Sequence, residues 1–220
     1  MAYILPDFDE AWAHENGFYL TSDVSRTAKL LAHYELFRRT VSLPGAIIEC
    51  GVFKGASLVR WATFRHLFGG PMSKHIVGFD MFGEFPGTEW EDDKPVRERF
   101  IQAAGSDSIS VPQLREVLER KGIADNVELV EGDICQTLPA YVAEHPALAV
   151  SLANLDTDIF EPAVTTLECL WDRLVPGGIL VLDDFGVFPG ETAAIREFFG
   201  DRDVRLEKLT YNNTPTFVTK

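Results

Sequence analysis

The sequence has few cysteines and a shortage of positive charge. Its three cysteines, Cys50, Cys135 and Cys169, are an odd number without a Cys-x-x-Cys pair, which argues against a disulfide framework or a thiolate zinc site and fits a reduced cytoplasm. Lysine and arginine together number 20, against 34 aspartates and glutamates, so the formal net charge is −14. Such a charge should repel the phosphates of nucleic acids and the headgroups of anionic lipids, so we expect neither partner.

Long apolar runs are also missing. No stretch approaches the roughly 18 uncharged apolar residues of a membrane-spanning helix, and residues 1–17 lack the basic region and apolar core of a signal peptide. The sequence therefore predicts a cytoplasmic protein without a membrane partner. With 46% hydrophobic and 25% charged residues, its 220 residues can bury one sizeable core, and we expect a single domain over residues 1–220.

Helical and strand patterns alternate along the chain. Apolar residues at helical spacing predict helices over residues 22–40, 55–68, 94–105, 110–122, 161–178 and 191–199. Short apolar or alternating runs predict strands over residues 46–50, 75–80, 126–133, 147–156, 179–184, 204–210 and 214–220. This order predicts an α/β fold with a parallel sheet covered by helices on both faces, and the last two strands predict an antiparallel edge.

Residues 81–110 interrupt this rhythm with a polar, irregular stretch that contains Pro86, Gly87 and the acidic run 89–93. Loops of this length inside compact domains are usually lids or binding loops. We therefore predict a substrate lid at 81–110. The helical segment before the first strand, within residues 1–43, is predicted to be a second, N-terminal lid.

Acidic residues lie in or directly after the predicted strands. Glu49 stands inside the apolar run 46–50, where an uncompensated carboxylate would lose much hydration energy, so either something binds it or the strand lies at an edge. Asp80 ends the second predicted strand, and Asp133 follows the third. Parallel sheets bind ligands beyond the carboxyl ends of their strands, which is where these acids are expected.

Two glycines, Gly51 and Gly55, lie in the predicted turn from the first strand to the next helix, where missing side chains would let a ligand approach the backbone. A tight turn that needs only small residues is the alternative. A dinucleotide site would have Gly-x-Gly-x-x-Gly with an acid about 20 residues on, whereas Asp80 comes 29 positions after Gly51 (80 minus 51). That spacing disfavours NAD.

The run Glu-Cys-Gly-Val-Phe-Lys-Gly at 49–55, the acid that ends the second strand and Glu-Gly-Asp at 131–133 together resemble the class I S-adenosylmethionine-dependent methyltransferases. The resemblance implies a Rossmann-like fold with a seven-stranded, mostly parallel sheet and an antiparallel edge pair. It places Glu49 near the cationic methionine part of S-adenosylmethionine, Asp80 at the ribose hydroxyls and Asp133 at the adenine amino group. The complete implied cofactor set is Glu49, Gly51, Gly55, Ser57, Asp80, Phe82, Asp133 and Ile134.

Two further motifs, Leu-Asp-Thr-Asp-Ile-Phe-Glu-Pro at 155–162 and Gly-Gly-Ile-Leu-Val-Leu-Asp-Asp-Phe-Gly at 177–186, resemble the macrocin (TylF-type) sugar O-methyltransferases. The same likeness extends over residues 17–23, 43–57, 78–86 and 187–199. The resemblance implies a site for Mg²⁺ or another divalent ion, formed by Asp156, Asp183 and Asp184. Asp156 is expected to be the catalytic residue that also accepts the proton.

The chemistry of methyl transfer to a hydroxyl also asks for such a site. A hydroxyl is a poor nucleophile until its proton leaves, a bound ion lowers its pKa, and hard divalent ions prefer carboxylate oxygens. Adjacent strand residues point to opposite faces, so Asp183 and Asp184 could share an ion only where the chain has left the strand. Asp158 and Glu161 have capping-box spacing, which predicts a structural role for Asp158. The five histidines are scattered and are expected on surfaces or helix faces.

The leading hypothesis is an S-adenosylmethionine-dependent, metal-assisted O-methyltransferase that acts on a deoxysugar hydroxyl, either nucleotide-linked or on a glycosylated natural product. Its partner would be a small sugar-containing substrate, and a homo-oligomer is left open. Three alternatives remain: methyl transfer to a catechol or other phenolic diol, a non-catalytic cofactor-binding partner of a tailoring enzyme, and an NAD oxidoreductase.

Overall fold

A seven-stranded sheet forms the centre of the computed structural model, which describes residues 3–220. The strand order is β3-β2-β1-β4-β5-β7-β6. The strands are β1 (Ala46–Cys50), β2 (Ile76–Asp80), β3 (Val127–Glu131), β4 (Val150–Leu155), β5 (Leu174–Leu182), β6 (Glu207–Lys208) and β7 (Thr216–Thr219). The first five strands are parallel, and β7 is antiparallel to both β5 and β6. The predicted fold class, with its antiparallel edge pair, is therefore confirmed.

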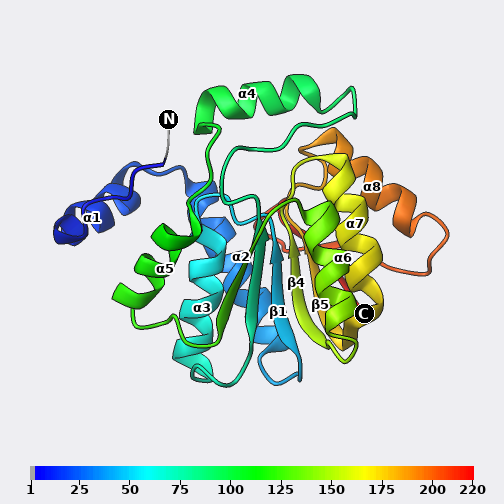
Figure 1. Cartoon of the computed structure of the whole chain (residues 1–220), viewed down its shortest axis with the longest axis horizontal. Helices are drawn as coiled ribbons and strands as arrows, with labels where there is room; N and C mark the ends of the chain where they lie inside the picture. The colour runs from blue at the N-terminus through cyan, green and yellow to red at the C-terminus, as the bar shows by residue number, and fades with distance from the viewer. Residues whose placement is uncertain (1–2) are drawn as a thin grey trace.

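Helices cover both faces of the sheet (Figure 1). They are α1 (Ala11–Thr21), α2 (Val24–Thr40), α3 (Ala56–Phe68), α4 (Lys94–Ala104), α5 (Val111–Arg120), α6 (Ile134–Glu144), α7 (Phe160–Leu170) and α8 (Pro189–Phe199), with 3-10 turns at Phe8–Glu10 and Trp171–Arg173. Helices α2, α3 and α5 lie on one side of the sheet, and α6, α7 and α8 lie on the other. Helix α4 of the predicted lid lies across the top of these layers, and α1 projects to one side. Residues 1 and 2 of the predicted N-terminal lid are outside the described residues.

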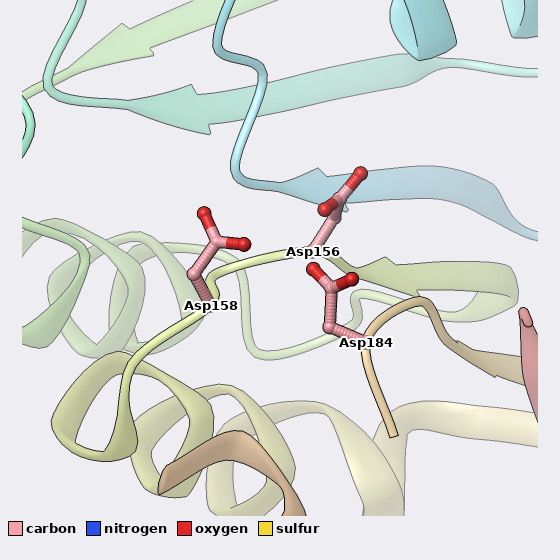
Figure 2. A group of neighbouring side chains, drawn as sticks. All are labelled: Asp156, Asp158 and Asp184. Atoms are coloured by element: carbon pink, nitrogen blue, oxygen red, sulfur yellow. The ribbon is translucent and has the colours of Figure 1, made fainter. Parts of the chain in front are cut away.

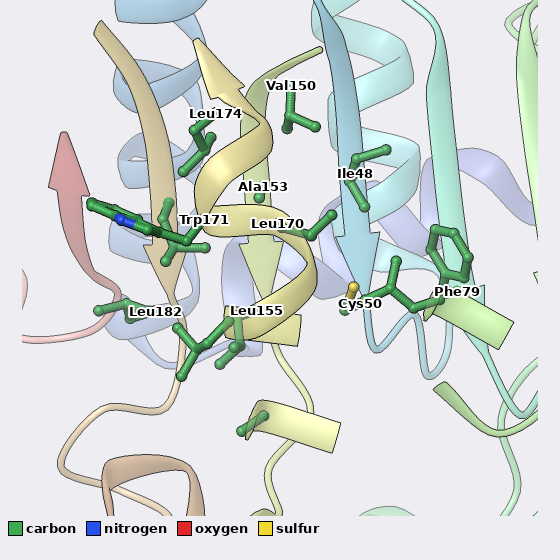
Figure 3. Packing of buried hydrophobic residues seen from close by; sticks show 14 of the residues in the cluster. Ile48, Cys50, Phe79, Val150, Ala153, Leu155, Leu170, Trp171, Leu174 and Leu182 are labelled. Atoms are coloured by element: carbon green, nitrogen blue, oxygen red, sulfur yellow. The ribbon is translucent and has the colours of Figure 1, made fainter. Parts of the chain in front are cut away.

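The core has two halves because alternate side chains of each strand point to opposite faces. Ile48 and Cys50 of β1 pack with residues of α6, α7 and α8, as Figure 3 shows in part. Ile47 of the same strand packs on the other face with α2, α3 and α5. Burial on both faces explains why the parallel strands read as short apolar runs instead of alternating ones. Within residues 3–220, no helix combines the length and apolar character needed to cross a membrane.

Helix termini follow the capping signals in the sequence. Asp23 caps α2 through the N–H of Ser25, and Ser110 forms a complete capping box with Gln113 at the start of α5. The predicted helix over 161–178 is wrong beyond Leu170. After a 3-10 turn the chain enters β5 at Leu174, which pairs with Val150 of β4, so the Pro-Gly-Gly stretch belongs to a strand.

Two helices were not predicted. Helix α6 is capped by Asp133 but contains Pro139, which removes one backbone hydrogen bond and weakens the helical pattern of the sequence. Helix α1 buries none of its residues, so no apolar face marks it in the sequence. The first of these helices matters for the site, because its N-terminus lies at the carboxyl edge of the sheet.

Candidate active site

A cavity of about 720 Å³ opens where the parallel strands end. Its walls come from the turn after β1, the end of β2, the turn before α6, the segment between β4 and α7, and the lid. The lid contributes a continuous stretch, Phe85–Glu89. Met81 and Ser108 of the lid also line it. The lining residues outside the lid include Gly51, Phe53, Asp80, Asp133, Ile134, Asp156, Thr157, Asp158 and Glu161.

The predicted cofactor residues divide into two groups at this cavity. Gly51, Asp80, Asp133 and Ile134 line it. Glu49, Gly55, Ser57 and Phe82 are absent from its lining. Phe82 packs in the core cluster beside α3 and α5, with φ +49°, and Gly55 precedes α3 with φ +82°. The cofactor-binding role of the whole set stays a prediction.

Glu49 is fully buried at the end of β1. Asn154 of the neighbouring strand β4 donates its Nδ2 to Oε1 of Glu49 over 3.5 Å, while Oε2 has no hydrogen-bond partner among the described residues. Burial raises the pKa of Glu49, and a hydrogen bond from Ser57 offsets this only in part. An acid with one unpaired buried oxygen is suited to a cationic group, which is what the prediction for Glu49 requires.

Asp80 organises the turn that carries the two glycines. Its Oδ2 accepts the backbone N–H groups of Val52 and Phe53 at 2.8 and 2.9 Å, and its Oδ1 accepts that of Phe82 at 2.7 Å. The carboxylate therefore joins the end of β2 to the start of the segment before α3. Asp80 also lines the cavity, and its contact with a ribose there stays a prediction.

Gly51 is required by the protein's own backbone. Its φ is +91°, and a Cβ added there would lie 1.8 Å from the carbonyl oxygen of Asp156. From the sequence, we expect this space to let a ligand approach the backbone. Gly51 does line the cavity, but the close approach that forbids a side chain is the approach of the β4 end to the β1 end.

Three carboxylates meet beside the cavity (Figure 2). Oxygen atoms of Asp156, Asp158 and Asp184 lie within 4.8 Å of one another, and the three side chains are half-buried. Burial raises the pKa of each, and the negative charge of neighbouring carboxylates raises it further. We call these three residues the acidic cluster. A donor set made only of carboxylates suits a hard divalent cation.

Asp183 is not part of the acidic cluster, although the sequence grouped it with Asp156 and Asp184. Its Oδ2 accepts a hydrogen bond from the Nζ of Lys29 on α2, and its Oδ1 lies 3.6 Å from Nε2 of His33. Burial is the largest influence and alone would raise the pKa of Asp183, but the charge of Lys29 and the contacts with His33 and Lys29 together outweigh it and hold the pKa well below the usual range. Asp183 thus faces α2, whereas Asp184 faces the cluster.

Asp158 takes the place in the cluster that was predicted for Asp183. The predicted capping role of Asp158 is wrong, because Ile159 occupies the N-cap position of α7 and Asp158 makes no capping hydrogen bond there. Asp158 has φ +66°, an uncommon conformation for a residue other than glycine. Glu161, its predicted capping-box partner, instead accepts hydrogen bonds from the Thr88 hydroxyl and the Glu89 N–H of the lid.

Sequence reasoning missed three residues that hold the site together. Lys29 and His33 are four positions apart on α2, so they lie on one face of the helix, and that spacing was the available signal. His33 lies on a helix face, one of the two expected positions, but that face is fully buried, and its ring stacks on Trp61 of α3 with ring centroids 4.5 Å apart. Glu191, also fully buried, accepts the backbone N–H groups of three residues: Thr157, Asp158 and Asp184.

Comparison with known proteins gives one family. The family model described as macrocin-O-methyltransferase (TylF) matches residues 26–218. A curated relative, the 8-demethyl-8-(2,3-dimethoxy-alpha-L-rhamnosyl)-tetracenomycin-C 4'-O-methyltransferase of Streptomyces olivaceus, is 29% identical over 147 residues, which cover 66% of this chain and 54% of the relative. The chain therefore spans about half the length of that relative.

Solved structures agree in fold. The calicheamicin methyltransferase CalS11 has a TM-score of 0.78 and 29% identity over 98% of this chain and 86% of its own. A second structure of CalS11, described as a TDP-rhamnose 3'-O-methyltransferase, has a TM-score of 0.67 and 27% identity, covering 93% of this chain and 84% of its own. The O-methyltransferase NovP has a TM-score of 0.75 but only 18% identity, covering 87% of this chain and 79% of its own, and so supports the fold alone.

Proposed function

The chain belongs to the macrocin O-methyltransferase (TylF) family, and on that premise we propose that it transfers a methyl group from S-adenosylmethionine to a hydroxyl of a deoxysugar with the help of a divalent ion. One observation carries this proposal. Two residues of the acidic cluster, Asp156 and Asp158, line the same cavity as Gly51 and Asp80. A methyl donor and a hydroxyl activated by carboxylates would therefore meet in one space.

The cavity fits S-adenosylmethionine by size and by charge. Bound S-adenosylmethionine would supply a methyl group on a positively charged sulfur. Glu49 is buried outside the cavity lining, so it would act on the cationic methionine end through its charge, whereas Asp80, which lines the cavity, would accept from ribose hydroxyls. Asp133 lies at the N-terminus of α6 and, with Ile134, lines the part of the cavity proposed for adenine.

The acidic cluster fits a divalent ion because its three members offer hard oxygen donors whose pKa values are raised by burial and mutual repulsion. We assign Asp156, Asp158 and Asp184 to hold it. A bound ion would lower the pKa of an acceptor hydroxyl. The predicted participation of Asp183 would have to use Oδ1, since Lys29 occupies Oδ2 and the carboxylate faces α2.

Two carboxylates could take the proton from the acceptor. Asp156 keeps the predicted role, and Lys29, whose Nζ is 3.8 Å from its Oδ2, lowers its basicity. Asp158 lines the cavity too, and burial and the charge of Asp156 raise its pKa, which makes it a second candidate for the base. Each is replaced by asparagine and kcat is measured against pH. Loss of the proton acceptor should remove the rise in kcat with pH that its deprotonation causes, so the profiles distinguish the two residues.

The choice of a deoxysugar rests on the relatives, whose descriptions name a rhamnosyl group and TDP-rhamnose. The lid stretch Phe85–Glu89 would exclude water from the acceptor, since it forms one wall of the cavity. The predicted cytoplasmic location, the absence of nucleic-acid and membrane partners, and the oligomeric state stay predictions.

The test is an assay of the purified protein with S-adenosylmethionine and a panel of nucleotide-linked deoxysugars, rhamnosylated aglycones and catechols, read by product mass. We expect a gain of one methyl group on a sugar acceptor, loss of turnover in EDTA and recovery with Mg²⁺ or Mn²⁺. If only catechols were methylated, the acceptor would be a phenolic diol instead of a sugar. EDTA-insensitive turnover would remove the ion from the proposal, and binding without any product would favour a non-catalytic partner.

A further inference from the structure

Asp93, the residue before α4, joins the lid to two other helices. It is fully buried. Its Oδ2 accepts the N–H of Phe160 at 3.0 Å, and its Oδ1 accepts the N–H of Gly190 at 2.7 Å. Phe160 is the first residue of α7 and Gly190 the second of α8, so one carboxylate binds the N-termini of both helices. Helix N-termini favour negative charge, which suits this arrangement.

The carboxylate of Asp93 packs closely against Gly190. A Cβ at Gly190 would lie 1.8 Å from Oδ2 of Asp93, so any larger residue there would displace the carboxylate. Burial raises the pKa of Asp93, and the hydrogen bonds from Gly190 and Phe160 act in the opposite direction. The neighbouring Asp92 is exposed. Asp93 is therefore distinguished from the other acids of the run 89–93 by what it contacts.

Both helices begin directly after the segments that carry the acidic cluster. Asp158 is two residues before Phe160, and Asp184 is six residues before Gly190. Glu191, the next residue of α8, accepts the N–H groups of Asp158 and Asp184 at 3.2 and 3.0 Å. The start of α8 is therefore linked through Glu191 to the backbone of two residues of the acidic cluster.

The same lid segment forms the cavity wall. Arg97, one turn after Asp93, donates to the carbonyl oxygens of Phe85 and Pro86, each at 2.6 Å. Trp90 stacks on Phe160 with ring centroids 4.1 Å apart. These contacts hold the cavity wall Phe85–Glu89 against α7, the helix that follows Asp158.

We propose that Asp93 is a positioning residue that couples the closed lid to the alignment of the acidic cluster, because it binds the first turns of α7 and α8 at once. The coupling is reciprocal: a cation that needs aligned carboxylates favours the closed lid, and the closed lid raises affinity for the cation. The part that concerns the cation rests on the proposed function, whereas the contacts of Asp93 do not.

The test compares Asp93→Asn with Asp92→Asn, a matched control that removes the same charge one residue away at an exposed position. Mn²⁺ binding is measured by calorimetry, and amide hydrogen exchange is followed at 85–91, at 156–160 and at the remote strand β7, without acceptor. In the wild type and the control, Mn²⁺ should slow exchange at 85–91. In Asp93→Asn we expect roughly tenfold weaker Mn²⁺ binding and faster exchange at both site segments, with β7 unchanged.

Gly190→Ala provides a second variant, because its methyl group should displace the carboxylate without altering Asp93 itself. It should reproduce the effects of Asp93→Asn. Uniformly faster exchange that includes β7 would show a purely structural role, and unchanged exchange at 156–160 in both variants would overturn the coupling. If the wild type binds no Mn²⁺, the metal part of the proposed function is wrong. Faster exchange at 156–160 in Asp93→Asn would still support the coupling between the lid and the acidic cluster.

Discussion

Replacement of Gly51 by alanine should damage the junction between β1 and β4. The added methyl carbon would lie 1.8 Å from the carbonyl oxygen of Asp156, whereas real Cβ contacts essentially never fall below 3.0 Å. The two backbone segments would have to separate by 3.0 minus 1.8, or 1.2 Å. The obstructing atom belongs to the backbone, so no side-chain rotation can relieve the overlap.

The expected loss of stability has two parts. A non-glycine residue at positive φ costs about 1–2 kcal/mol, and over-packing typically costs about 1–3 kcal/mol, which together give about 2–5 kcal/mol. Gly70→Ala isolates the first part, because Gly70 has φ +81° and a Cβ there would meet nothing within 4 Å. The difference between the two variants measures the clash alone.

Urea unfolding of both variants, with calorimetric titration of S-adenosylmethionine and Mn²⁺, tests this reasoning. Gly51→Ala should unfold more easily than Gly70→Ala by about 1–3 kcal/mol and should lose affinity for both ligands, since Gly51 and Asp156 line one cavity. Equal stability of the two variants would refute the clash. Weaker cofactor binding with stability equal to that of Gly70→Ala would instead support the sequence argument that the methyl group occupies ligand space.

Three further predictions concern single carboxylates or their partners. Asp80→Asn leaves one side-chain oxygen to accept three backbone N–H groups, so it should lower the free energy of unfolding by about 1–3 kcal/mol and also weaken cofactor binding. Weaker binding with an unchanged melting temperature would show that Asp80 serves the ribose alone. Lys29→Met leaves Asp183 buried without its partner and should cost about 3–5 kcal/mol in thermal unfolding, whereas a cost below about 1 kcal/mol would show the pair to be dispensable. The pKa of Asp184 is raised in the folded state, so the native protein binds more protons than the unfolded one, and its stability without divalent ions should fall as pH rises above 3.8. Asp184→Asn should make that fall less steep in urea unfolding experiments from pH 5 to 8. Equal slopes for the variant and the wild type would contradict this.

The strand ends could be predicted because burial and local geometry act over short distances. The apolar run 46–50 is buried on both faces, as is typical of strands in parallel sheets, and Ser110 with Gln113 has the spacing of a capping box. Asp80 and Asp133 line the cavity because parallel strands end at one edge. These features need no knowledge of distant residues.

The membership of the acidic cluster could not be predicted in the same way. Asp183 and Asp184 are neighbours in sequence, and Lys29, 154 residues before Asp183, decides which of them faces α2. The left-handed backbone of Asp158 directs its carboxylate to the cluster, and nothing in the spacing to Glu161 distinguishes that from a cap. Side-chain direction at these positions is fixed by tertiary contacts, which sequence spacing does not show.

The acids at the carboxyl edge share a physical feature that links the two proposed ligands. Glu49, Asp184 and Glu191 come from different elements, yet burial raises the pKa of each above its ordinary value. A raised pKa means that the fold disfavours the charged form, at about 1.4 kcal/mol for each unit. Core packing would favour apolar residues at such positions, and departures from that rule are expected at functional sites. A methyl sulfonium and a divalent cation are both positive, so each would favour the ionised carboxylates, and both proposed ligands thus follow from one distribution of charge.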